Sequence, residues 1–259
     1  LSKYGGLSVV DVSVKDQLKL LGRFDLSGEP FEMYVKDGVA FAMYSSFGHY
    51  VGSGSSWQWV HSSAVVALDV KDPAKISKLG ELLLPGQISD SRIFGYILYV
   101  VSYENGSCWN CATNERTNVL SLDVKVPAKV AKVGELAFDS SGADYGWGRR
   151  SVLAPQARLY VAGRDGSGAQ GSTIQIVDIS DPSKPVITDS IVSNTRRVND
   201  VMTTPDGKYL VFTREGASDR KNGIVICSLE DPLHPKVISE FTEGVTAGVH
   251  SAFIFQQEK

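Results

Sequence analysis

Short runs of alternating apolar and polar residues follow one another along the whole chain, and Gly, Pro, Asp and Asn separate them. The runs are rich in β-branched and aromatic residues, as in AFAMY at 40–44, ILYVVSY at 97–103 and KYLVF at 208–212. Such runs are typical of β-strands. No segment of about ten or more residues has a helical period. The pattern therefore predicts an all-β protein.

One run, IQIVDISDPSKP at 174–185, recurs along the chain. The other copies are LSVVDVSVKDQ from Leu7, VVALDVKDPAK from Val65, NVLSLDVKVPAK from Asn118 and GIVICSLEDPLHP from Gly223. The signature residues at the end of each strand, Asp11, Asp69, Asp123, Asp178 and Ser228, are separated by 58, 54, 55 and 50 residues. A period in this range indicates a repeat architecture.

Each repeat contains further strands in the same order. An outer strand follows the signature turn and reaches a small or polar residue eleven positions after the signature residue: Gly22, Gly80, Gly134, Asp189 or Ser239. A more polar inner strand comes next, starting near Pro30, Ile88, Gly148, Arg197 and Gly248, and an aromatic strand then leads to the next repeat. Four short strands per repeat predict the blades of a β-propeller. A β-sandwich is the alternative, but it does not require a turn repeated at this spacing.

The two ends of the chain complement each other. The N-terminus supplies the last two strands of a repeat, and the C-terminal GVHSAFIF supplies the first. A final blade shared between the termini would give five four-stranded blades and would remove exposed sheet edges. We therefore expect residues 1–259 to form a single β-propeller domain. Most of the second strand of the shared blade is missing, so a longer protein with more blades stays open.

The composition is that of a globular protein. The net charge of −3 argues against nucleic acid as a partner, because phosphate binding requires a basic surface. No apolar run is long enough to span a membrane as a helix. The chain does not begin with Met, so we expect a mature or excised fragment whose targeting signal lies outside it.

The recurring IVDISDP-KP signature resembles the LVIVD repeat of bacterial and archaeal β-propellers, most clearly at 174–185. The segment from about Leu26 to Pro182 is similar to secreted bacterial proteins with a C-terminal propeller, and the segment from Asn199 onward to other LVIVD proteins. The resemblance implies a secreted, periplasmic or cell-surface propeller without an established reaction. The chain departs from the signature at Ser228, Val126 and Val14.

Aligning the inner strands places five polar residues at one equivalent position: Glu32, Asp90, Arg150, Asn199 and His250. The first strand of each propeller blade lines the central channel, so these side chains are predicted to converge there. They could bind a small polar ligand or supply a general acid and base. They could instead pair with one another as a salt-bridged plug in the channel, and we favour that interpretation. A divalent cation is an open alternative, but Arg150 would repel it, so we expect no metal and no cofactor.

The signature Asp residues also have two possible roles. They could be ligands, but an Asp at a strand end more often accepts hydrogen bonds from N–H groups of the following turn. We expect the turn role.

Two long segments, Ser45 to Ser63 and Glu104 to Thr117, join aromatic strands to signature strands and are expected to be loops on one face. They carry the candidate binding residues Trp57, Trp59, His61 and Trp109. Aromatic side chains in exposed loops favour contact with protein or carbohydrate, although they could also pack on each other.

The second loop contains a C-x-x-C pair, Cys108 and Cys111. Zinc would require further ligands, and a redox role would require a helix after a strand. A local disulfide is the favoured interpretation and implies an oxidising compartment. Cys227 lies in an apolar strand and is expected to be buried.

No nucleophile elbow, phosphate-binding loop, zinc-protease motif or dinucleotide fingerprint is present. We therefore favour a non-catalytic extracytoplasmic propeller that binds protein or glycan through its loops. One alternative is a hydrolase or lyase that uses the channel residues. Another is a structural subunit of a surface layer or fibre, self-associating through its incomplete blade.

Overall fold

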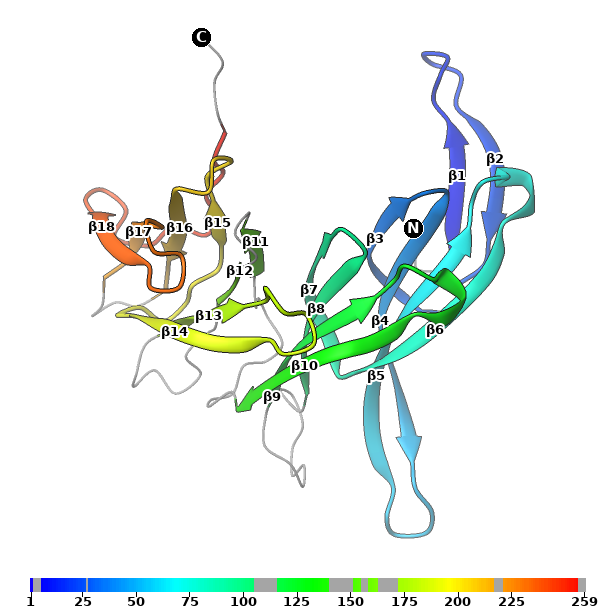
Figure 1. Ribbon diagram of the computed structural model, residues 1–259, viewed down its shortest axis with the longest axis horizontal. Coiled ribbons are helices and arrows are strands. Elements are labelled where there is room, and N and C mark those ends of the chain that lie inside the picture. Colours follow the sequence, from blue (N-terminus) through cyan, green and yellow to red (C-terminus); the bar gives the residue numbers. More distant parts are fainter. Residues whose placement is uncertain are drawn as a thin grey trace. The chain divides into compact units, whose positions relative to one another are not determined.

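The computed structural model describes residues 1, 6–26, 28–104, 116–139, 151–154, 158–162, 172–216 and 221–255. The chain divides into two compact units, one made of Leu1–Glu104 with Leu122–Val133 and the other of the remaining residues. Figure 1 shows that the described elements are almost all strands. The helical elements among them are two single 3-10 turns, η1 (Pro73–Lys75) and η2 (Pro127–Lys129). The predicted all-β class is confirmed.

Four sheets contain four strands each, and consecutive strands lie side by side in every one of them. The first sheet is formed by β3 (Glu29–Lys36), β4 (Val39–Val51), β5 (Gln58–Asp69) and β6 (Ser77–Pro85). The second is formed by β7 (Gln87–Phe94), β8 (Ile97–Glu104), β9 (Arg116–Asp123) and β10 (Ala131–Asp139). The third is formed by β11 (Ser151–Ala154), β12 (Arg158–Ala162), β13 (Ser172–Asp178) and β14 (Val186–Ser193). The fourth is formed by β15 (Val201–Thr203), β16 (Tyr209–Arg214), β17 (Gly223–Ser228) and β18 (Lys236–Phe241).

The order of strands within each sheet is the order predicted from the repeats. The polar run is the first strand, the aromatic run the second, the signature run the third and the outer run the fourth. The predicted four-stranded sheet is therefore confirmed for the repeats whose signature residues are Asp69, Asp123, Asp178 and Ser228.

The remaining sheet has two strands, β1 (Leu7–Asp11) and β2 (Lys19–Phe24). The predicted strand at the C-terminus is not formed, since residues 249–255 have no strand conformation. Gly248 instead forms an isolated bridge with Glu215, and the Val249 N–H donates to the Arg214 carbonyl at 3.0 Å. A fifth blade shared between the termini stays a prediction.

The signature residues shape the turn that follows each signature strand. A carboxylate oxygen accepts the N–H of the second residue onward at Asp11 (2.9 Å), Asp69 (3.1 Å), Asp123 (2.8 Å) and Asp178 (2.8 Å). At the divergent position the Ser228 hydroxyl accepts the Glu230 N–H at 3.3 Å. The turn role predicted for these residues is confirmed, and Ser228 keeps it in a weaker form.

A β-bulge recurs in the outer strands. In four outer strands, one extra residue lies directly before the position that is eleven residues after the signature residue. These extra residues are Leu21, Leu79, Thr188 and Ile238. The backbone beyond the bulge approaches the signature turn of the following repeat. A Cβ atom on Gly22, Gly80 or Gly134 would lie 1.6, 2.4 or 2.0 Å from the carbonyl oxygen of Pro73, Pro127 or Pro182, respectively. These glycines are therefore required by the close packing of consecutive repeats.

The fourth repeat replaces this glycine with Asp189. The Asp189 carboxylate lies 3.0 Å from Nδ1 of His234 in the following turn, and the Thr188 hydroxyl donates to the Leu233 carbonyl at 3.3 Å. A side-chain pair thus takes the place of the direct backbone contact.

The core of the second unit contains Cys227, which is fully buried among Tyr160, Ile174, Leu210 and Phe212. The expected apolar environment of this thiol is confirmed. Burial raises its pKa to about 12.

We expect Cys227 to react with iodoacetamide at pH 8 at least roughly a thousandfold more slowly in the folded protein than in urea, because the thiolate is the reactive form. Peptide mapping by mass spectrometry would distinguish Cys227 from the other two cysteines. Rapid labelling of the folded protein would show that this strand opens readily.

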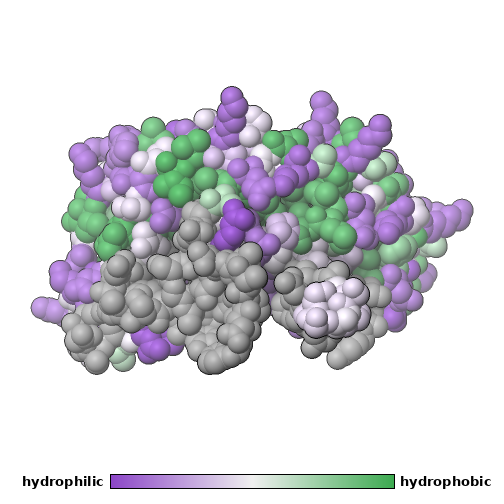
Figure 2. All heavy atoms as spheres, turned by 90° about the horizontal axis from the view of Figure 1, so that it is seen from below, coloured by the Kyte–Doolittle hydropathy of each residue, from purple (hydrophilic) through white to green (hydrophobic). Residues whose placement is uncertain are grey.

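Charged and apolar side chains are mixed on the surface. Figure 2 shows small apolar groups between hydrophilic residues on one face. Large exposed apolar side chains include Leu20, Ile238 and Phe241 on outer strands. Within the described ranges, no helix is long and apolar enough to cross a membrane.

Candidate functional site

The predicted channel residues of the first unit occupy equivalent positions in their sheets. Both Glu32 on β3 and Asp90 on β7 directly follow a bulged residue, Phe31 or Ser89. They pair with Met43 and Val101 on the neighbouring strands. The register therefore places Glu32 and Asp90 at the same position of their sheets.

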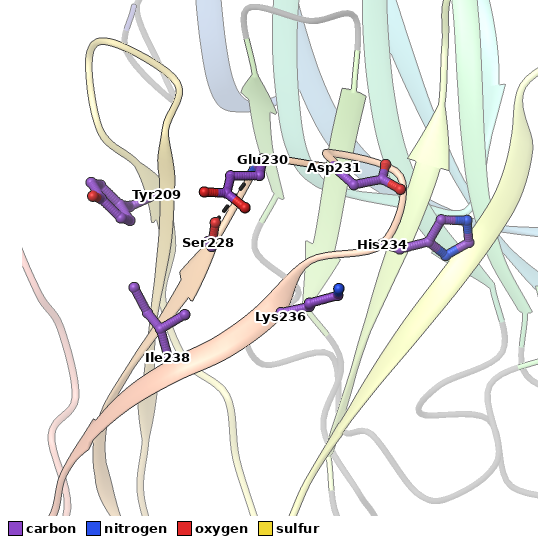
Figure 3. Close-up of a pocket in the computed structure, with 7 residues that line it drawn as sticks. All are labelled: Tyr209, Ser228, Glu230, Asp231, His234, Lys236 and Ile238. Carbon is purple, nitrogen blue, oxygen red and sulfur yellow. Dashed lines mark hydrogen bonds between the residues drawn. The ribbon is translucent and has the colours of Figure 1, made fainter.

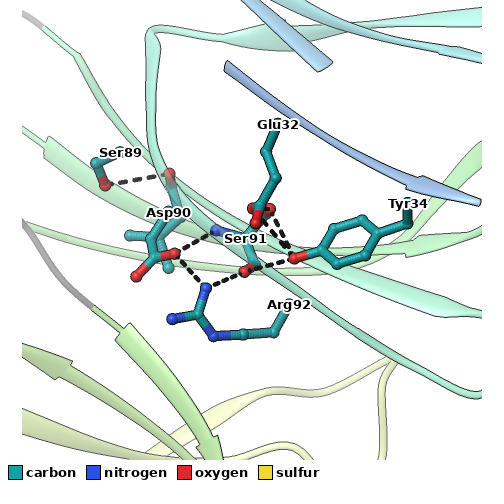
Figure 4. Close-up of polar contacts among 7 residues, drawn as sticks. Glu32, Tyr34, Ser89, Asp90, Ser91 and Arg92 are labelled. Atoms are coloured by element: carbon teal, nitrogen blue, oxygen red, sulfur yellow. Dashed lines mark hydrogen bonds and ion pairs between the residues drawn. The ribbon is translucent and has the colours of Figure 1, made fainter. Parts of the chain in front are cut away.

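These two carboxylates lie in one hydrogen-bonded network, which Figure 4 shows. The Ser91 hydroxyl donates to Glu32 Oε2 at 2.5 Å, and the Tyr34 hydroxyl donates to the same oxygen at 3.1 Å. Asp90 Oδ1 accepts the Ser91 N–H at 2.8 Å and pairs with Arg92 Nη1 at 2.6 Å. Four neighbouring side chains are thus linked through Ser91.

The network is mostly buried. Asp90 is only 5% exposed, and Arg92 supplies the opposite charge that a buried carboxylate requires. Burial also raises the pKa of Tyr34, and the nearby Glu32 carboxylate adds to the increase. The phenol therefore remains a donor at neutral pH. The contacts support the structural interpretation of Glu32 and Asp90 more than the ligand interpretation.

The second unit contains Asn199 and His250, and the structure brings these two together. Glu215 Oε2 accepts from Asn199 Nδ2 at 2.6 Å and lies 2.8 Å from His250 Nδ1. Arg197 Nη1 lies 3.5 Å from the other carboxylate oxygen. Sequence reasoning missed Glu215 because it lies just after the aromatic strand and outside the inner-strand alignment.

A carboxylate bound to one imidazole nitrogen can orient the ring for proton transfer through the other nitrogen. His250 is mostly exposed, as such a base would need to be. Within the described part of the chain, however, no serine, threonine or cysteine side chain is hydrogen-bonded to this imidazole. The geometry provides an oriented histidine without a nucleophile.

The register also changes the alignment predicted for Asn199. The Thr213 N–H donates to the Asp200 carbonyl at 3.0 Å, and the Asp200 N–H donates to the Thr213 hydroxyl at 3.1 Å. Tyr209 pairs with the signature residue Ser228, and Val39 pairs with the signature residue Asp69. Thr213 and Met43 lie four residues after Tyr209 and Val39, so they occupy equivalent places on β16 and β4. Asp200, rather than Asn199, is therefore the equivalent of Glu32.

Convergence of the five predicted channel residues stays a prediction. Arg150 lies outside the described residues, and the other four are divided between the two units. No group of three or more His, Cys, Asp or Glu side chains is placed to hold a metal ion among the residues that the structure describes.

The segment Ser45 to Ser63, expected to be a loop, is instead mostly β-hairpin. Pairing of β4 with β5 continues to Val51 and Gln58, whereas β3 ends opposite Ser45 and β6 ends opposite Ser62. Figure 1 shows the two strands continuing together past the others as an arm. The β4–β5 arm, defined here as residues 46–61, has a free length of about 14 Å from its four terminal pairs.

A tight turn closes the tip of the arm. Ser56 donates to the Ser53 carbonyl through its N–H at 3.1 Å and through its hydroxyl at 2.7 Å. Gly52 has a φ of 130°, and a Cβ there would lie 2.3 Å from the Ser56 carbonyl. Trp57, next to this turn, is 57% exposed.

The structure describes the strand pairing of two other candidate binding residues, Trp59 and His61, but not Trp109. Trp59 pairs with Tyr50, and His61 with Gly48, along the arm. Trp109, Cys108 and Cys111 lie outside the described residues, so the predicted disulfide is not tested.

Sequence reasoning did not predict a hollow of about 420 Å³ beside the fourth sheet, shown in Figure 3. Its lining residues are Tyr209, Ser228, Glu230, Asp231, His234, Lys236 and Ile238. The lining residue Ile238 precedes Ser239. Ser239 is the equivalent of the glycines that contact the following turn in earlier repeats. We interpret it as part of the packing surface of the sheet.

Comparison with known proteins agrees with this architecture. The beta propeller domain matches residues 1–137, and the LVIVD repeat matches residues 159–192. The first match covers more than half of the chain. The chain therefore belongs to the beta-propeller domain family, and it carries an LVIVD repeat in its second half. Both the fold and the resemblance noted from the signature are confirmed.

Individual relatives are distant. Hydrazine synthase subunit beta of Kuenenia stuttgartiensis is 26% identical over 125 residues, which are 48% of this chain and 28% of that protein. The chain thus spans less than a third of the length of this curated relative.

Two solved structures share the fold with TM-scores of 0.50 while covering 90% of this chain. One is a protein from Lactobacillus plantarum, 11% identical and covered over 64% of its length. The other is a hypothetical selenium-binding protein from Sulfolobus tokodaii, 10% identical and covered over 72%. At these identities the similarity concerns the fold alone.

Proposed function

We propose that this chain is a non-catalytic, extracytoplasmic β-propeller that binds a protein or a glycan through its β4–β5 arm. The observation that supports this role is the arm itself, with Trp57 exposed beside its tip. A hairpin without neighbouring strands is marginally stable in water and contributes little to the packing of its sheet. Its length is therefore better explained by contact with a partner than by the stability of the fold.

The chemistry of the arm suits recognition. Tryptophan buries a large area at a low conformational-entropy cost and is enriched among the residues that dominate binding energy. The backbone of a two-stranded arm also offers unpaired edge groups, to which an extended segment of a partner could add.

The relative from Kuenenia stuttgartiensis is, by its name, one subunit of an enzyme, and a subunit must contact other proteins. This supports a protein partner over a glycan. The proposed location rests on the similarity of the signature to secreted propellers. An enzymatic role has less support. Neighbouring groups bind both Glu32 and Asp90, and among the described residues no nucleophilic side chain is hydrogen-bonded to His250.

Replacing Trp57 with alanine is expected to weaken partner binding by about 2 kcal/mol, or roughly thirtyfold, as for a central interface tryptophan. Partners would be identified by screening glycans and extracytoplasmic proteins with the intact chain. Affinities of the variant and the parent would then be compared by calorimetry.

Phe94→Ala is the matched control. Phe94 is 58% exposed, close to the 57% of Trp57, but it lies at the turn between β7 and β8. Its replacement should leave affinity unchanged. A screen in which the intact chain binds nothing, or equal affinities for both variants, would contradict the proposal.

A further inference from the structure

Consecutive repeats of this chain pack on one another through their signature turns. The Tyr160 hydroxyl on β12 donates to the carbonyl of Pro232, in the turn after β17, at 3.1 Å. On the same face of the third sheet, Tyr160, Ile174 and Ile176 are fully buried in one core with apolar residues of the fourth sheet. The following repeat therefore covers this face of the third sheet.

The equivalent face of the fourth sheet is exposed. Val211, Ile224 and Ile226 hold the register positions of the three buried residues of the third sheet, but they are only half-buried. Tyr209 and Ile238 on the same face are 41% and 56% exposed, and both line the hollow of Figure 3. We call these five residues the acceptor face. An exposed apolar face with a hollow in it is typical of an interaction surface.

The turn between β1 and β2, residues 12–18, has the backbone of a signature turn, but all of its residues are exposed. The Gln17 N–H donates to the Val14 carbonyl at 3.2 Å. At the same positions of the next turn, the Lys75 N–H donates to the Asp72 carbonyl at 2.9 Å. Residues 12–18, called the donor turn below, are therefore already shaped like the turns that pack on a preceding sheet.

Two valines flank the signature residue Asp11. Val10 is 43% exposed and Val12 is 71% exposed. The equivalent residues of the fourth sheet, Cys227 and Leu229, are 0% and 4% exposed and belong to the core shared with the third sheet. Val10 and Val12 thus expose to solvent the apolar surface that this other repeat buries against the preceding sheet.

Both surfaces also carry charges of both signs. The hollow at the acceptor face is lined by the acidic Glu230 and Asp231 and by the basic Lys236. The donor turn contains Lys15 and Asp16. Each charge therefore has an opposite charge available on the other surface, which favours one orientation of the contact.

We propose that the acceptor face binds the donor turn of a second copy of this chain. The two surfaces match because consecutive repeats already make this contact within the chain. Both are exposed in the single chain, so the turn that fills the acceptor face comes from another molecule. Every copy has one acceptor face and one donor turn, and such head-to-tail contacts build a ring or a filament. The contact does not involve the β4–β5 arm, so it goes beyond the binding function proposed above.

The test is sedimentation velocity of the full chain over a wide range of concentrations. We expect the parent to associate as its concentration rises. Val12→Asp alters the donor turn, and Ile238→Asp alters the acceptor face. Both residues are exposed, so both variants should fold. Each variant alone should associate at least about tenfold more weakly, because the new carboxylate would be buried in an apolar contact.

An equal mixture of the two variants tests the head-to-tail arrangement. The intact donor turn of the Ile238→Asp chain can still bind the intact acceptor face of the Val12→Asp chain. We therefore expect the mixture to form dimers with the affinity of the parent contact, and nothing larger. An isologous contact would not be restored in this way.

Val192→Asp is the matched control. Val192 is 67% exposed, close to the 71% of Val12, but it lies on β14, outside both surfaces. This variant should associate as the parent does. A parent that stays monomeric at every concentration, as it would if its own β1–β2 hairpin filled the acceptor face, would overturn the proposal. A mixture of the two altered chains that forms no dimers would overturn it as well.

Discussion

Replacement of Gly134 by alanine is expected to lower the free energy of unfolding by about 3 kcal/mol, at the upper end of the range for overpacked sites. The new Cβ would lie 2.0 Å from the Pro182 carbonyl oxygen and 3.0 Å from the carbonyl carbons of Pro182 and Ser183. All three are backbone atoms, so no rotamer change can relieve the overlap. The outer strand and the signature turn of the following repeat would have to separate.

Urea unfolding followed by far-UV circular dichroism would measure the loss. Gly95→Ala is the matched control, because a Cβ there has nothing within 4 Å and only the positive φ of 59° opposes it. We expect Gly95→Ala to cost about 1 kcal/mol. Equal losses for the two variants would show that the close approach to Pro182 does not constrain the fold.

The repeat period made the architecture predictable. Hydrophobic runs and a turn at a constant spacing determine strand order, since both depend on local chemistry that recurs in every copy. The glycine eleven residues after Asp11, Asp69 and Asp123 could be located in the same way. Its reason could not be predicted, because the carbonyl of Pro182 approaches Gly134 from a repeat about fifty residues away.

The candidate sites were less predictable for two physical reasons. A single-residue shift in register changes which side chain occupies a position. The bulges at Phe31 and Ser89 have no counterpart where β15 pairs with β16. For this reason, alignment of the sequence alone matches Asn199, and not Asp200, with Glu32. The length of the β4–β5 arm depends on where β3 and β6 end, which the sequence of residues 46–61 does not reveal.

Replacement of Asp178 by alanine is also expected to lower the free energy of unfolding by about 3 kcal/mol. Asp178 Oδ1 accepts the Ser180 N–H at 2.8 Å and pairs with Arg158 Nη1, directly opposite on β12, at 2.8 Å. The Arg158 side chain is only 13% exposed. Loss of the turn hydrogen bond should cost about 1 kcal/mol. Loss of the opposite charge beside a largely buried guanidinium should cost about 2 kcal/mol more, less than for a fully buried pair.

Asp69→Ala isolates the contribution of the turn. Asp69 makes the equivalent bond to the Lys71 N–H at 3.1 Å, but Val39 lies opposite it instead of an arginine. We expect this variant to lose only about 1 kcal/mol, measured by the same urea unfolding. If both variants lose the same amount, the Arg158 pair adds nothing to stability.

The pH dependence provides a second measurement of the Asp178 pair. Burial raises the pKa of Asp178, but the bonds from Ser180 and the Arg158 charge outweigh it and hold the pKa below its usual value. A carboxyl with a lowered pKa contributes stability above its unfolded-state pKa, and this stability is lost as the pH falls below about 4. The parent should therefore lose more stability than Asp178→Ala between pH 5 and pH 3. Parallel curves would mean that Arg158 does not favour the ionised form of Asp178 in the folded protein.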